Sequence, residues 1–455
     1  MKYCWSLLIL CLFSSNLWAN TSMMFKTDTP MAHRVLEIPA QKISAMKGEK
    51  ISDLRLVRID PISKSISMPV WQMNEVTTSH VPYTSKVDLP SSGVAGTLDA
   101  DDRLVVELKS AGIAATPELI SSIKKQFSVN TGELIEVQVP LENNEFGYFY
   151  LFKAPHAATP KPVVTYKKGL FKTPYYSVQL DPENPINWGD FWYEGFSDSS
   201  KKTILDTMKI RMDGGVFTKF TPLRIDNDNL RSEVLDIIEG DLSTTIVMQI
   251  KVVVAGIRVM RLLVYFEAFP ERFSIHAHAD IPSIAKSVLV DPNLAISLDG
   301  NNLEGSRVQV AGMPGISATI DGTLSDEEKS MQKTGINPKQ NWIWFSTGKN
   351  FDLFSYMEVP DNFPAEVSLE YQDDKTKKDK PERFVGASPN VGYLMTGLPA
   401  GQALIFHAHL YFLDKMPEAN AVKFADVIRY NAELASKTYP IAWDIQLAEL
   451  QQKRK

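Results

Sequence analysis

The sequence predicts an all-β chain that ends in a helical segment. Runs rich in Val, Ile, Thr, Tyr and Phe recur along most of the 455 residues at the spacing typical of β-sandwiches. Short turn sequences such as Asp213-Gly214-Gly215 and Asp299-Gly300 separate these runs. A glycine turn joins the long runs 244–254 and 258–269, which predicts one long hairpin. Strands of this length favour large curved sheets over a small immunoglobulin-type module.

The first 19 residues have the pattern of a secretory signal peptide. Lys2 precedes an apolar run from Trp5 to Phe13, and Ala19 precedes a polar residue, as at a cleavage site. The run is shorter than the roughly 20 apolar residues that cross a bilayer. Cys4 and Cys11 both lie in this segment, so the mature chain would be cysteine-free. We therefore expect a periplasmic or secreted protein with no membrane span in the mature chain.

Composition also predicts the order of the domains. Pro155, Pro160 and Pro162 make a stiff connector between two β regions. A short helix is predicted from Thr116 to Phe127, and a long one at 417–437, where apolar residues recur every three or four positions. The predicted segments are 1–19 (signal peptide), 20–153 (N-terminal β-sandwich), 154–162 (Pro-rich linker), 163–415 (large β domain) and 416–455 (C-terminal helical segment).

Charge and motifs exclude several function classes. The chain has 48 basic and 54 acidic residues, a net charge of −6, so it has no electrostatic footprint for nucleic acid. It contains no phosphate-binding Walker loop, nucleophile elbow, zinc-protease helix or dinucleotide fingerprint. The sequence therefore leaves open whether the protein is an enzyme.

Two His-Ala-His triplets stand out within the predicted strands. One contains His276 and His278, and the other His407 and His409. Because side chains alternate along a strand, the two histidines of each triplet share one face. If the two strands are neighbours, the four imidazoles would suit a divalent metal. The alternative is a polar sheet face whose histidines bind neighbouring side chains or water.

A dense aromatic cluster spans residues 187–193 and is predicted to be a loop. Sugar rings stack their C–H faces on exposed indoles, while nearby carboxylates bind the hydroxyls. The predicted ligand-binding residues are therefore Trp188, Asp190, Trp192 and Tyr193. The alternative is that these rings fill the space between domains, because aromatic side chains dominate core burial.

Two stretches carry a resemblance to known proteins. The first stretch resembles the small β-sandwich in some exported carbohydrate-processing proteins. It contains the strand Leu54–Ile59, then Met68–Gln72, and then an acidic turn that leads into the strand around Leu104. Arg103 departs from the acidic residue often found there. The larger domain, with Asp236–Gly240 before a long hairpin, looks like the supersandwich of galactose-mutarotase-like proteins. This resemblance implies a supersandwich fold, and carbohydrate by analogy.

Three functions remain open at this point. The leading hypothesis is an exported cell-envelope protein that binds or processes an oligosaccharide or polysaccharide. The first alternative is a non-catalytic periplasmic or secreted scaffold that binds another protein, which an exposed flat apolar patch would favour. The second is a metal-dependent enzyme that uses the paired His-Ala-His strands, with a divalent metal as cofactor.

Overall fold

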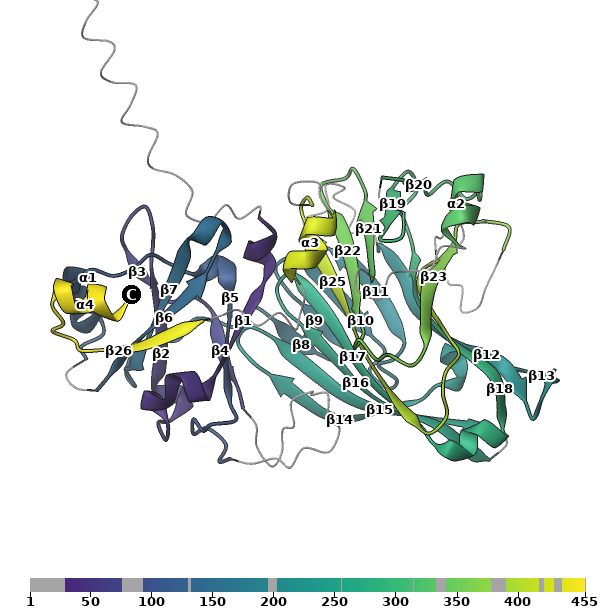
Figure 1. Ribbon diagram of the computed structural model, residues 1–455, viewed down its shortest axis with the longest axis horizontal. Helices are drawn as coiled ribbons and strands as arrows, with labels where there is room; N and C mark the ends of the chain where they lie inside the picture. The colour runs from purple at the N-terminus through teal and green to yellow at the C-terminus, as the bar shows by residue number, and fades with distance from the viewer. Residues whose placement is uncertain are drawn as a thin grey trace, which may run out of the picture.

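The computed structural model describes residues 29–75, 93–129, 132–194, 203–254, 256–313, 315–332, 341–377, 390–416, 421–428 and 436–454. The predicted signal peptide lies outside these residues. Figure 1 shows two β bodies side by side, a smaller one built from the N-terminal region together with the last described residues, and a larger one built from the residues between them. The prediction of an all-β chain is confirmed.

The smaller body is a sandwich of two antiparallel sheets within the described residues. One has the order β1-β5-β4 and the other β26-β6-β7-β2-β3. Alternate residues of both sheets, such as Leu104 and Phe149, meet in a shared core. The strands are β1 (Val35–Pro39), β2 (Leu54–Ile59), β3 (Ile66–Ser67), β4 (Trp71–Asn74), β5 (Arg103–Glu107), β6 (Leu134–Pro140), β7 (Phe146–Lys153) and β26 (Lys437–Ile441).

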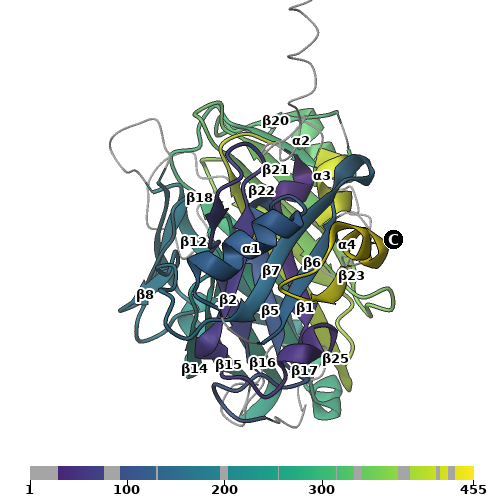
Figure 2. The same ribbon diagram turned by 90° about the vertical axis from the view of Figure 1, so that its left-hand side faces the viewer.

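Two helices cover the outer face of the five-stranded sheet (Figure 2). Helix α1 (Pro117–Gln126) begins where the sequence predicts, with the Thr116 side chain accepting a hydrogen bond from the Leu119 amide. Helix α4 (Leu447–Lys453) comes from the end of the chain and buries Leu450. The last described residues therefore return to the smaller body.

The C-terminal prediction is wrong in one respect. Helix α3 (Ala421–Ile428) lies within the predicted helix, and residues 429–435 lie outside the described part. Lys437, however, begins strand β26 and does not end a helix. Strand β26 pairs along its whole length with β6, so hydrogen bonds to a distant strand decide its structure. Local periodicity does not contain that information.

The larger body consists of two sheets that each have nine strands among the described residues. We call them the β12 sheet and the β17 sheet. The β12 sheet has the order β23-β24-β18-β12-β11-β10-β9-β8, with β13 also paired to β12. Its strands are β8 (Thr165–Lys167), β9 (Leu170–Lys172), β10 (Tyr176–Leu180), β11 (Trp188–Tyr193), β12 (Leu205–Val216), β13 (Thr218–Ile225), β18 (Leu289–Gly300), β23 (Glu366–Gln372) and β24 (Asn390–Thr396).

The β17 sheet has the order β14-β15-β16-β17-β25-β22-β21-β19-β20. Its strands are β14 (Ser232–Glu239), β15 (Thr244–Val254), β16 (Ile257–Ala268), β17 (Arg272–Ile281), β19 (Arg307–Val310), β20 (Ala318–Thr319), β21 (Asn341–Ser346), β22 (Asp352–Glu358) and β25 (Gln402–Leu413), and α2 (Asp326–Met331) follows β20 in the chain. The predicted long hairpin is confirmed, because β15 and β16 pair from end to end.

The two large sheets pack face to face over an aromatic core. Phe273 on β17 contacts Trp188 on β11, with ring centroids 5.2 Å apart, and Phe412 on β25 stacks on Phe191 at 4.8 Å. These side chains occupy one face of β17 and β25. The opposite face of the β17 sheet is therefore left for polar residues.

Candidate functional site

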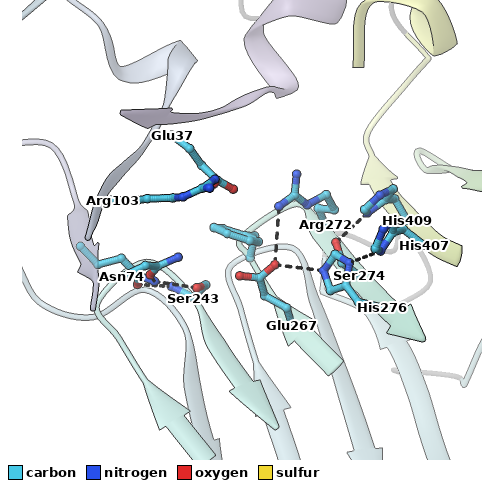
Figure 3. A network of polar contacts seen from close by, with 12 residues as sticks. Glu37, Asn74, Arg103, Ser243, Glu267, Arg272, Ser274, His276, His407 and His409 are labelled. Atoms are coloured by element: carbon cyan, nitrogen blue, oxygen red, sulfur yellow. Dashed lines mark hydrogen bonds and ion pairs between the residues drawn. The ribbon is translucent and has the colours of Figure 1, made fainter. Parts of the chain in front are cut away.

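The structure brings the two His-Ala-His strands together. Strands β17 and β25 are antiparallel neighbours, with His276 opposite His407 and Ser274 opposite His409. All four histidines lie on the face that points away from the aromatic core, and all four are buried. We call this surface the histidine face, and Figure 3 shows His276, His407 and His409 on it.

A chain of hydrogen bonds crosses the histidine face. The Nδ1 atoms of His276 and His407 are 2.9 Å apart, and His276 Nε2 is 3.4 Å from Glu267 Oε2 on β16. An N–H of one ring must donate to the lone pair of the other. If His276 donates from Nε2 to Glu267, its Nδ1 accepts from His407. The Nε2 atom of His407 then carries a lone pair.

A second chain runs beside the first. The His409 Nδ1 atom is 2.9 Å from Ser274 Oγ, and its Nε2 is 3.9 Å from a carboxylate oxygen of Glu358 on β22. Arg272 lies 3.9 Å from Glu267, and its guanidinium sits over the Phe269 ring. The site thus combines imidazoles, two carboxyl groups, a hydroxyl and a guanidinium.

Burial sets the charges on this face. Desolvation lowers the pKa of all four histidines, and it lowers the pKa of His407 to about 3. The rings are therefore neutral near pH 7. Desolvation also raises the pKa of Glu267 to about 7, against the opposing effect of Arg272. A carboxyl group that is half protonated near neutral pH thus adjoins a neutral imidazole.

His278 differs from the other three histidines. Its side chain is 3% exposed, and neither ring nitrogen has a hydrogen-bond partner in the described part of the chain. Its ring lies near those of Tyr265 and His407, with centroids 6.2 and 6.4 Å away. Two residues further along β17, Asp280 is exposed. The Asp280 end is therefore the open end of the histidine face, exposed to solvent at Asp280, and His278 is the histidine nearest to it.

The other end of the histidine face is closed by the smaller body and α3. Glu271 accepts hydrogen bonds from His33 at 2.8 Å and from Lys109 at 2.9 Å, both in the smaller body. Burial opposes ionisation of Glu271, but these two partners outweigh it and lower its pKa to about 2. On α3, Phe424 packs edge-on against Tyr411 of β25. Figure 1 shows α3 at the junction of the two bodies.

The structure brings the histidines of the predicted metal site close together but does not arrange them as metal ligands. Among the described residues, no group of three or more His, Cys, Asp or Glu side chains is arranged to hold a metal ion. The Nδ1 atoms of His276 and His407 contact each other at 2.9 Å, so this pair of nitrogens does not face a shared metal position. The metal-binding role of His276, His278, His407 and His409 stays a prediction.

The aromatic cluster is a strand, so its prediction as a loop is wrong. Strand β11 pairs with β10, and Trp188 and Tyr193 point into the core, where both are buried. They are therefore not placed to stack on a ligand. Trp192 is partly buried, donates its indole N–H to Glu194 and shares the strand with exposed Asp190. A ligand role for Trp192 and Asp190 stays a prediction.

Sequence reasoning missed Glu267, Arg272, Ser274 and Glu358. Arg272 and Ser274 precede the first triplet by four and two residues, so strand alternation alone places them on the face of His276. Glu267 and Glu358 come from other strands. Only the register between β16, β17, β25 and β22 brings these two carboxyl groups beside the imidazoles.

Comparisons with known proteins give distant structural similarities only. No family model and no curated protein sequence matches the chain. An alpha-mannosidase from Enterococcus faecalis V583 is similar over 90% of this chain and 43% of its own, with 9% identity and a TM-score of 0.44. The chain thus spans less than half of that protein.

Two aldose epimerases are similar to a smaller part of the chain. A GalM/aldose epimerase homologue from C. elegans covers 56% of this chain and 99% of its own length, at 9% identity and a TM-score of 0.34. Galactose 1-epimerase from Lactobacillus acidophilus NCFM covers 61% and 98%, at 10% identity and 0.32. Both are of the protein class that the sequence resemblance names. With TM-scores below 0.5, the similarities assign no activity to this chain.

Proposed function

We propose that this chain is an exported cell-envelope protein that binds or processes carbohydrate, with its ligand at the open end of the histidine face. The observation that carries the proposal is His278. Leaving a buried polar group without a hydrogen bond costs about 1–3 kcal/mol, so such a group needs an explanation. A ligand that supplies the missing hydrogen bonds is the explanation we favour.

Sugar hydroxyls suit the His278 ring in its neutral form. A neutral imidazole has one N–H donor and one lone-pair acceptor, and burial keeps this ring neutral near pH 7 by lowering its pKa. A hydroxyl both donates and accepts, so neighbouring hydroxyls of one sugar satisfy both ring nitrogens. The signal-peptide pattern of residues 1–19 supports the cell envelope as the place where this ligand is met.

The hydrogen-bond chain beside His278 supports proton transfer to or from the ligand. A proton accepted by His407 at Nε2 would be matched by transfer from its Nδ1 to His276, and from His276 Nε2 to Glu267. The raised pKa of Glu267 favours this exchange, because an acid or base works best when its pKa is near the operating pH. Proton transfer of this kind opens and closes sugar rings.

Thermal unfolding against a panel of oligosaccharides, uronates included, tests the proposal. A ligand at about 100 times its Kd stabilises the folded chain by about 2.7 kcal/mol. For a body of this size, each kcal/mol raises the midpoint by about 2–4 °C. We expect a saturable rise with one class of sugar. No rise with any sugar would contradict the proposal.

Catalysis is tested separately from binding. With the sugar identified, Glu267→Gln should retain the thermal shift and lose at least a hundredfold in the rate of anomer interconversion, measured by polarimetry. Glu239→Gln, on exposed β14, is the matched control and should leave both properties unchanged. A wild-type chain that binds the sugar without changing it is a binding protein.

A scaffold that binds another protein is the second candidate, and strand β14 favours it. In the described structure β14 is an edge strand, paired only with β15, and Val234, Leu235 and Ile237 on it are exposed. Exposed apolar edges are sites where an extended segment of another chain adds to a sheet. Capture of one protein partner, lost on Leu235→Lys, would support this function over carbohydrate.

A further inference from the structure

One end of the larger body carries exposed apolar side chains on three separate connections. Phe217, between β12 and β13, is 59% exposed, and Phe220 at the start of β13 is 84% exposed. Val253 near the end of β15 and Ile284 in the short 3₁₀-helix η7 (Ser283–Ser287) are each more than half exposed. Figure 1 shows the β12–β13 hairpin projecting from this end. We call these four residues the apolar tip.

Backbone contacts hold the three connections together. The Phe217 amide donates to the carbonyl of Val288, the residue that follows η7, at 2.7 Å. Helix η7 packs against β16 and β18. The β15–β16 turn closes with Val254 opposite Ile257, at the end of β16 that extends beyond β17. The apolar tip is thus one region, and single exposed apolar residues elsewhere on the surface are ordinary by comparison.

The backbone at Phe217 points to a constraint on this ring. Its φ is 58°, in the left-handed region that phenylalanine rarely adopts. Such strain persists only where the surrounding structure imposes it, and it gathers at functional positions. Here it holds an aromatic ring outward, away from any core.

The segments that carry the apolar tip have basic side chains and no acidic ones, although exposed Asp213, Asp280 and Asp291 lie on the strands that flank them. Lys219, Lys251, Arg258 and Lys286 are exposed, and the segments 217–220, 251–258 and 283–287 contain no Asp or Glu. The Lys219 ammonium lies 5.5 Å from the centroid of the Phe220 ring. Lys251 pairs with Glu233 at 3.5 Å, but both side chains are more than half exposed, so this ion pair is weak. The tip is therefore basic on a chain whose net charge is −6.

We propose that the apolar tip docks the protein peripherally onto a membrane surface rich in anionic lipid. Aromatic rings on turn tips enter the boundary between headgroups and acyl chains, while the flanking cations contact the headgroups. The positive charge favours an anionic bilayer. Side chains on separate turn tips suit insertion into a fluid surface better than packing against a flat protein face. Within the described residues no helix is apolar and long enough to cross a bilayer.

Cosedimentation with lipid vesicles tests this proposal. The full chain should sediment with vesicles of phosphatidylglycerol and phosphatidylcholine at 0.1 M salt. It should bind weakly to phosphatidylcholine alone, and 0.5 M salt should reduce binding to the anionic vesicles. Phe217→Asn with Phe220→Ser should lower the partition coefficient at least tenfold. Asn tolerates the backbone of position 217. Lys219→Glu with Lys286→Glu should lower it at least fivefold for each position.

Ile62→Ser is the matched control, because Ile62 is almost fully exposed but lies in the smaller body. It should bind as the wild type does. All variants share residues 1–28, so any binding through that segment is common to them. Circular dichroism verifies folding, and the charge variants, which alter only exposed side chains, are informative if the aromatic variant unfolds. Equal binding by wild type and both tip variants would overturn the proposal. Self-association through the tip without vesicle binding, seen by sedimentation velocity, would also overturn it.

Discussion

Strand β17 has two buried faces of opposite character. Phe273, Ile275 and Ala277 face the aromatic core, while Ser274, His276 and His278 form the histidine face. The core face is filled by aromatic rings that are stabilised by packing against one another. The histidine face is closed by hydrogen bonds at one end and has an unpartnered ring, among the described residues, at the other. Both faces are buried, and they differ in how their side chains are satisfied: by packing on the core face and by hydrogen bonds on most of the histidine face.

The largest expected effect comes from breaking the core face. Trp188→Ala should lower the free energy of unfolding by about 3–5 kcal/mol, because it empties a site that contacts Phe191, Phe266 and Phe273. The thermal midpoint should fall by roughly 10 °C. A stable variant, with a midpoint within 2 °C of the wild type, would show that the core face is not the main support of the larger body.

The histidine face should respond to pH in a way that the core face does not. Because the pKa of Glu267 is raised to about 7, folding favours its protonated form, and stability is lost as pH rises from 4.5 through 7. In Glu267→Gln this loss is absent. The free energy of unfolding of the variant should therefore gain about 3 kcal/mol relative to the wild type between pH 4.5 and pH 8. Urea unfolding at both pH values measures it, and a constant difference would contradict the raised pKa.

The histidines have the opposite dependence on pH. Their lowered pKa values mean that folding favours the neutral rings, so stability is lost as pH falls below the ordinary value of 6.5. His407→Gln should be less sensitive to acid than the wild type between pH 6.5 and pH 4. His156→Gln, in the predicted linker, is the control, and equal acid sensitivity of all three proteins would argue against buried neutral histidines.

The closed end of the histidine face should show a smaller effect. Glu271→Gln removes the charge that holds His33 and Lys109, and we expect a loss of about 2 kcal/mol at pH 7. The pKa of Glu271 is lowered to about 2, so this contribution is lost as pH falls from 4.5 to 2. The difference between variant and wild type should therefore shrink at pH 3. A difference that stays constant with pH would show that the ion pairs do not stabilise the joint.

Much of this arrangement follows from sequence alone, because strand alternation is a local property. Alternation placed His276 with His278 and His407 with His409, and the turn residues located the long hairpin. Register between strands far apart in the chain is not local, and 131 residues separate the paired His276 and His407. The position of Glu267 beside them was therefore not predictable. The burial of Trp188 is not predictable for a related reason. A cluster of aromatic residues in the sequence does not show which face of their strand another sheet covers.

We propose that the ligand binds at the histidine face and not at the aromatic strand β11. Isothermal titration with the sugar identified by thermal shift compares His278→Ala with Trp192→Ala, and circular dichroism verifies that both variants fold. We expect His278→Ala to weaken binding at least tenfold and Trp192→Ala to leave it unchanged. The reverse result would place the ligand at β11 instead.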